Sequence, residues 1–122
     1  MKTLRIGIAN YEDMKARTLA IARGDVKPSR DEPKLWFTSM ESLARVLSDK
    51  NRELLDLIIE QQPNSLTELE FISGRAKSNL SRTLKNMARF GLVVLTKGDG
   101  GAITPHVPYG KINFDLQMGA HQ

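Results

Sequence analysis

Residues 74–86 of the chain read GRAKSNLSRTLKN, and the prediction of the fold depends on this stretch. It lies in a longer segment, from Phe71 to Gly98, that contains six Lys or Arg residues and no Asp or Glu. Residues 39–72 instead carry three cations and seven anions. The net charge of the whole chain is only +4, so its positive charge is concentrated in one segment. Such a concentration creates a local field that favours a polyanion as partner.

The apolar residues of this segment are spaced as on an amphipathic helix. Leu80, Leu84 and Met87 follow one another at i, i+4 and i+7, which predicts a helix from about residue 76 to residue 90 with these three side chains in the core. Gly91 is expected to end it. The residues predicted to contact DNA are Lys77, Ser78, Asn79, Ser81, Arg82, Lys85, Asn86 and Arg89 of this helix, and Lys97 beyond it.

These residue types suit a DNA groove. An Arg side chain can bond to guanine through two donors, and an Asn side chain can do the same with adenine. Small Ser side chains let the N-terminus of a helix approach a phosphate, where the backbone N–H groups and the helix dipole favour negative charge. Acidic side chains would repel the phosphates, which explains their absence from the segment. A solvated charged face is the ordinary alternative, and the uniform sign of the charge argues against it.

Two predicted helices come directly before this one. Residues 49–62 form an apolar pattern that stops at Pro63. A short helix then begins at Ser65 and Glu68, which have capping-box spacing, and ends at Gly74. The short helix, the tight turn and the basic helix together predict a helix-turn-helix.

A predicted hairpin follows the basic helix. Residues 92–104 read LVVLTKGDGGAIT, which indicates a strand, a glycine-rich turn and a return strand. Ile112, Phe114 and Leu116 alternate with polar residues and predict one further strand. A hairpin in this position is the wing of a winged helix-turn-helix. The predicted fold class is therefore α+β, a winged helix-turn-helix with an N-terminal strand-helix extension.

The N-terminal extension has its own pattern. Residues 3–9 alternate as in a half-buried strand, and Asn10 can cap a helix that runs from Tyr11 to about Arg23. The residues expected on its apolar face are Met14, Thr18, Ile21 and Ala22. Residues 25–34 contain two prolines and mixed charges, as a linker does. We expect residues 1–34 to be an extension for dimerisation or partner docking, and residues 35–118 to be the DNA-binding domain.

The predicted DNA-binding domain begins with two short elements. Leu35 to Phe37 are expected to form a strand, and the capping-box spacing of Thr38 and Glu41 predicts a helix that runs to about Leu47.

Other classes of protein find little support in the sequence. The chain has no Cys, and its two His residues, His106 and His121, lack the spacing of metal ligands, so we predict no metal and no cofactor. The motif G-x-S-x-G is absent around Ser78 and Ser81, and the glycine-rich turn lacks the features of a phosphate-binding loop. We therefore do not expect an enzyme. No apolar run approaches the length of about 20 residues that spans a bilayer, and the N-terminus lacks a secretory signal, so we expect a soluble cytoplasmic protein.

Residues 76–93 (AKSNLSRTLKNMARFGLV) resemble the recognition helix and following strand of winged-helix transcriptional regulators of the MarR and ArsR kind. Residues 6–24, 34–55 and 107–116 extend the resemblance to a group of short prokaryotic DNA-binding proteins that are often read as antitoxins encoded beside a toxin. The resemblance implies a winged-helix fold, binding to double-stranded DNA as a homodimer, repression of the protein's own operon and a cognate toxin as protein partner. The alternative is a winged-helix interaction module that uses its basic face on an acidic protein.

Overall fold

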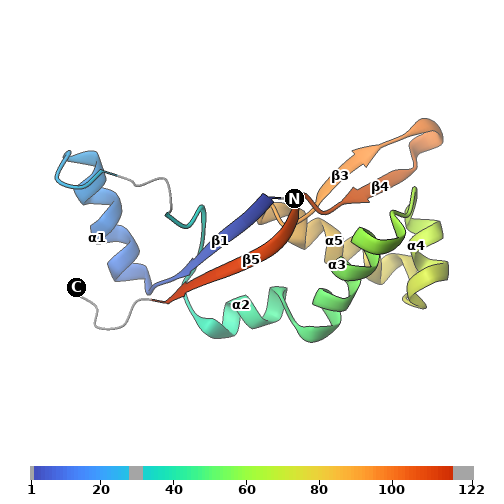
Figure 1. The fold of residues 1–122 in the computed structure, drawn as a ribbon, viewed down its shortest axis with the longest axis horizontal. Coiled ribbons are helices and arrows are strands. Elements are labelled where there is room, and N and C mark those ends of the chain that lie inside the picture. The colour runs from blue at the N-terminus through green and yellow to red at the C-terminus, as the bar shows by residue number, and fades with distance from the viewer. Residues whose placement is uncertain (1, 28–31, 117–122) are drawn as a thin grey trace. The chain divides into compact units, whose positions relative to one another are not determined.

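The computed structural model describes residues 2–27 and 32–116 of the chain. The predicted tail with His121, and part of the predicted linker, lie outside these residues. The described residues form an α+β protein with five α-helices, a three-stranded sheet and a two-stranded hairpin (Figure 1). They divide into two compact units, which are described separately: a sheet unit of residues 2–45 and 111–116, and a helical unit of residues 46–110.

The sheet unit contains strands from both ends of the chain. β1 (Lys2–Ile8) lies between β2 (Leu35–Phe37) and β5 (Tyr109–Leu116), which begins just before residue 111. β1 and β2 are parallel, with Ile6 opposite Leu35 and Ile8 opposite Phe37. The first two strands lie where the sequence predicts them. Because β2 pairs with β1, the predicted domain boundary after residue 34 falls inside the sheet unit, between two paired strands.

α1 (Tyr11–Ala22) connects β1 to β2 and begins as predicted. The Asn10 side chain accepts a hydrogen bond of 2.8 Å from the Asp13 backbone N–H, and Gly24 follows the helix with a φ of 81°. The predicted apolar face is only partly covered, because Met14 and Ile21 are half-buried while Thr18 and Ala22 are exposed. No residue of α1 is buried.

α2 (Met40–Val46) begins one residue later than its predicted cap implies. The sequence predicts a capping box of Thr38 and Glu41, and this assignment is wrong. The hydroxyl of Ser39 instead accepts a hydrogen bond of 3.1 Å from the Ser42 backbone N–H. Ser39 and Thr38 both carry a hydroxyl group suited to capping, so residue type alone does not distinguish them.

The helical unit contains α3 (Asp49–Gln61), α4 (Leu66–Ser73), α5 (Lys77–Arg89), β3 (Val94–Lys97) and β4 (Ile103–His106). β3 and β4 form an antiparallel hairpin. α4 packs against α3, α5 and β4, and α5 also packs against β3. The buried apolar residues of this unit are Val46, Leu47, Leu54, Leu55, Ile58, Leu66, Leu69, Leu80, Leu84, Met87, Leu92 and Val93.

Local signals set the ends of these helices. The Ser65 hydroxyl accepts a 3.0 Å hydrogen bond from the Glu68 backbone N–H, as the predicted capping box requires. The Glu68 carboxylate accepts from the backbone N–H of Asn64 at 3.1 Å, one residue before the expected donor. Gly74 and Gly91 follow α4 and α5 with φ values of 73° and 79°, a region that glycine enters without strain.

The single Trp of the chain, Trp36 in β2, is in close contact with Gly7 in β1. Gly7 lies opposite Trp36 in the parallel register, and a Cβ atom at Gly7 would overlap the indole ring. The guanidinium of Arg17, which is ion-paired with Glu32, lies 6.0 Å from the centroid of the same ring. The sheet unit therefore requires Gly at position 7, because the ring occupies the space of a side chain.

We predict that Gly7→Ala forces Trp36 out of its position and lowers the free energy of unfolding by about 1–3 kcal/mol. Chemical denaturation measures the loss, and the emission spectrum of the single Trp reports the displacement. Gly98→Ala is the matched control, because its Cβ would meet only the Ala102 carbonyl oxygen, at 3.8 Å. Equal stability of the two variants, with unchanged emission, would contradict the packing of Trp36 on Gly7.

Candidate nucleic-acid interface

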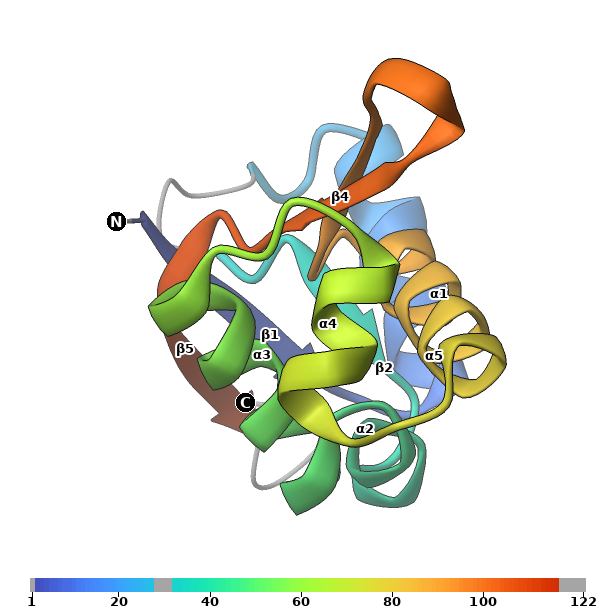
Figure 2. The ribbon, with the colours of Figure 1, turned by 90° about the vertical axis from the view of Figure 1, so that its right-hand side faces the viewer.

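α5 is strongly two-sided. Leu80, Leu84 and Met87 have no exposed surface, as predicted, and they hold α5 in the core of the helical unit. Figure 2 shows α5 beside α4, with the turn of the β3–β4 hairpin extending beyond them. The opposite side of α5 carries exposed polar residues, and we call this set the basic face: Ser78, Arg82, Lys85, Asn86 and Arg89.

The cations of the basic face are not neutralised within the described part of the chain. Arg82, Lys85 and Arg89 have neither an ion pair nor a hydrogen bond among the described residues. Lys97, at the end of β3, is also exposed. Arg89 lies in the last turn of α5, where positive charge also complements the helix dipole. The positive field of these side chains is therefore available to a partner.

Asn79 lies differently from the other predicted contact residues. It is half-buried, and its Oδ1 accepts hydrogen bonds from Nε and Nη2 of Arg75, at 3.0 and 2.8 Å. Nη2 of Arg75 also lies 3.4 Å from the Thr83 hydroxyl. Arg75, in the connection between α4 and α5, was not among the predicted site residues. The signal that could have identified it is its position four residues before Asn79, the spacing at which side chains meet on a helix.

Ser81 also departs from the basic face. It is half-buried and lines a small gap between α5 and the hairpin, together with Leu66, Leu84, Lys85, Leu95 and Ile103. Of the nine predicted residues, the structure exposes seven and turns Asn79 and Ser81 toward the rest of the helical unit.

The N-terminus of α5 already holds a carboxylate. Ala76 precedes the helix and provides no side-chain cap. Glu70 of α4 takes that role, since its Oε2 accepts a 2.7 Å hydrogen bond from the Lys77 backbone N–H. The Lys77 ammonium in turn donates to the hydroxyl of Thr67 at 3.1 Å. A phosphate at this helix end, which the small Ser residues suggest, would have to compete with Glu70.

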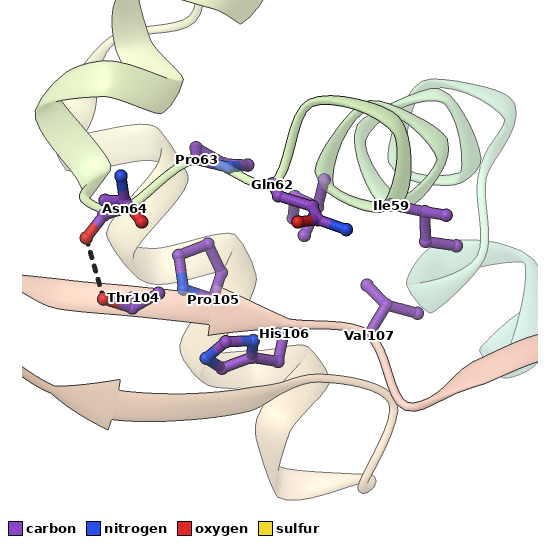
Figure 3. A pocket seen from close by; sticks show the side chains of 9 residues that line it. Ile59, Gln62, Pro63, Asn64, Thr104, Pro105, His106 and Val107 are labelled. Atoms are coloured by element: carbon purple, nitrogen blue, oxygen red, sulfur yellow. Dashed lines mark hydrogen bonds between the residues drawn. The ribbon is translucent and has the colours of Figure 1, made fainter. Parts of the chain in front are cut away.

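The hairpin is attached to the helices by a side-chain hydrogen bond. The Thr104 hydroxyl of β4 donates to the Asn64 carbonyl oxygen at 2.7 Å (Figure 3). Beside this bond lies a cavity of about 290 Å³, whose lining includes Gln62, Pro63 and Pro105. Gln62 ends α3 with a φ of 48°, unusual for a residue other than Gly, and it thereby turns the chain toward α4.

Residues 2–27 and 32–116 contain neither a metal-binding cluster nor a membrane-spanning helix. Within these ranges no group of three or more His, Asp or Glu side chains is arranged to hold a metal ion. None of the helices described is long and apolar enough to cross a membrane.

The family model HVO_A0114 matches residues 46–114. The match covers more than half of the 122 residues, so the chain belongs to the HVO_A0114 family. It begins where the helical unit begins and continues into β5. No curated protein and no solved structure matches the chain.

We predict that Glu70→Ala removes the cap of α5 and lowers the free energy of unfolding by about 0.5–2 kcal/mol. Chemical denaturation measures the change. Glu60→Ala is the control, because Glu60 is an exposed residue of α3 without a hydrogen bond in the described structure. If both variants were as stable as the parent protein, the Glu70 carboxylate would not be capping α5.

Proposed function

We propose that this protein is a winged helix-turn-helix regulator that binds specific double-stranded DNA. In this proposal α4 and α5 form the helix-turn-helix, and the β3–β4 hairpin is the wing. The observation that carries the proposal is the basic face of α5, whose cations are exposed and unpaired among the described residues. The buried opposite side of the same helix supports it, because packing leaves only this face available to a groove.

The residues of the basic face divide between reading bases and binding phosphates. Arg82 lies at the centre of the face and is assigned to a base edge, for which its fork of donors is suited. Lys85, Arg89 and Lys97 are assigned to phosphates, which fix the position of the protein on the duplex. Asn79 is assigned no base contact, since Arg75 already occupies its amide oxygen.

The biological role follows from the resemblance described above. We propose a cytoplasmic repressor of its own operon, acting as the antitoxin of a toxin-antitoxin pair, with no enzymatic step. The identity of the neighbouring gene tests this role, since a neighbour that encodes no toxin would remove the antitoxin assignment and leave DNA binding untouched.

A second candidate function is a protein-interaction module without specific DNA binding. One observation favours it: Phe71, on α4, is 90% exposed, more than any other large apolar residue described. Such a side chain suits a protein partner better than a phosphate backbone. The two functions differ in salt dependence, because DNA binding releases counterions and must weaken steeply as salt rises.

We propose that the protein binds DNA as a two-fold dimer, which presents two basic faces to half-sites about 10 base pairs apart. Residues 1–34 were expected to serve dimerisation or docking, but Leu4, Ile6 and Ile8 of β1 are buried and offer no apolar side chain to a second copy. β5 is an edge strand of the sheet, and it exposes Phe114 by 56% and Leu116 by 49%. An edge strand with apolar side chains is suited to pairing with a second copy.

We expect Arg82→Ala to weaken operator binding by about 1–3 kcal/mol and to relax the sequence preference, while the fold is retained because the side chain is exposed. We expect Lys85→Gln to weaken binding to all sequences about equally and to lower the slope of log K against log salt by about one unit. Binding titrations on operator and unrelated DNA at several salt concentrations measure both effects.

Lys15→Gln is the control for these two variants, because it removes an exposed cation of α1, outside both the helical unit and β5. Undiminished operator binding by Arg82→Ala would exclude α5 as the recognition helix. A parent protein whose binding is indifferent to both salt and DNA sequence would favour the interaction module.

For the dimer, we predict that Phe114→Asp produces a folded monomer with much weaker operator binding, since a carboxylate would be buried at the paired edge. Sedimentation velocity gives the assembly state, and circular dichroism confirms folding. Phe71→Asp is the matched control, a more exposed Phe in the helical unit. A monomer obtained from Phe71→Asp but not from Phe114→Asp would place the dimer interface on α4.

A further inference from the structure

β5 lies beside β1 at one end of the three-stranded sheet, and its outer side has no strand partner among the described residues (Figure 1). With eight residues it is the longest strand described. A long edge strand presents a row of backbone N–H and C=O groups to which another strand can bind. Such edges are commonly protected by Pro or by charged side chains. β5 contains no Pro, so its charges decide which strand it can accept.

The two charged residues of β5 are Lys111 and Asp115. Both are exposed, and their side chains have neither an ion pair nor a hydrogen bond among the described residues. They lie two residues before and two residues after Asn113. Because side chains alternate along a strand, these three residues share one face, while Ile112 and Phe114 lie on the other. β5 therefore has a polar face with opposite charges at its two ends and an apolar face.

The symmetry of a dimer limits how two copies of β5 can pair. Residues directly opposite each other in an antiparallel pair are of the same hydrogen-bonding kind, so a two-fold axis between identical strands must coincide with a residue position. An axis at Asn113 places Lys111 opposite Asp115 of the second copy, twice in the dimer. Any other axis leaves these two charges without each other as partners. The charge pattern of β5 is thus complementary to itself in a single register.

We propose that β5 pairs antiparallel with β5 of a second copy about a two-fold axis at Asn113, forming one continuous sheet with three strands from each copy. The same register places Ile112 opposite Phe114 of the second copy and covers a Phe side chain that is otherwise 56% exposed. Opposite charges, and an aromatic residue beside a β-branched one, are cross-strand pairs that stabilise antiparallel sheets. This inference rests on the dimer proposed above and specifies its register and its ion pairs.

The first test reverses one charge at a time in the full-length protein without DNA. Lys111→Glu would place two carboxylates opposite each other at both ends of the paired strands, and Asp115→Lys would do the same with two ammonium groups. Each variant is expected to weaken dimerisation about ten- to thirtyfold, measured by sedimentation velocity over a range of protein concentrations. Circular dichroism verifies that each variant is folded. The double variant is expected to dimerise within about threefold of the parent protein.

An equimolar mixture of the two single variants tests the register directly. In a mixed dimer, the two acidic side chains of one chain lie opposite the two basic side chains of the other. The mixture is therefore expected to dimerise about as tightly as the parent protein, although each variant alone does not. A mixture that associates no more tightly than the separate variants would overturn the proposed register.

A cross-link provides an independent measurement, since the chain has no Cys. Opposite residues of an antiparallel pair have Cα atoms about 4.5–5.5 Å apart, a separation that a disulfide can bridge. Asn113→Cys is expected to form a disulfide-linked dimer with oxidised glutathione. Lys15→Cys, at an exposed position of α1, is the control for chance collisions. Equal yields of cross-linked dimer from the two variants would contradict an axis at Asn113.

The outcomes for this inference and for DNA binding are observed separately. A parent protein that sediments as a monomer, or a dimer that neither charge reversal weakens, would overturn the pairing of β5. The assignment of α5 to DNA would be unaffected by either result, because it is measured by titration with operator DNA.

Discussion

The burial of Leu80, Leu84 and Met87 is the constraint on which the proposed site depends. These side chains fix the rotation of α5 about its own axis, because any other rotation would expose them or bury a cation. Once the rotation is fixed, Arg82, Lys85 and Arg89 must lie on the surface. The glycine-ended connection after α4 lets α5 start in the direction that this packing requires. The core of the helical unit thus determines which chemistry is presented to a partner.

Carboxylates lie next to the basic face but not within it. The segment free of Asp and Glu begins at Phe71, and Glu70, one residue earlier, binds the first backbone N–H of α5. The negative charge is placed where it stabilises a helix terminus, and it is kept from the side of the helix where Arg82 lies. What the helical unit can bind depends on the position of each charge more than on the net charge of +4.

Local sequence signals, such as helix caps and terminal glycines, predicted much of the fold. The caps at Asn10 and Ser65 and the glycines after α4 and α5 are local, and the structure confirms them. One local cap was misassigned, to Thr38 in place of Ser39, and the other interactions that were missed join residues from different elements. The cap that Glu70 provides to α5 and the pairing of β1 with β2 depend on tertiary packing, which periodicity does not encode. The Asn79 side chain, predicted to contact DNA, likewise bonds to a residue outside its helix.

The helical unit is a continuous segment, whereas the sheet unit is assembled from residues on both sides of it. This arrangement imposes an order on folding during synthesis. The helical unit can form as soon as residue 110 has left the ribosome, and β1 and β2 can already pair. β5 emerges last, after a separation of about a hundred residues from its neighbour β1, so closing the sheet is the step with the largest loop entropy. Until β5 has paired, one edge of β1 is without a partner and can pair with another chain. Assembly of the sheet unit is therefore the stage most vulnerable to mispairing.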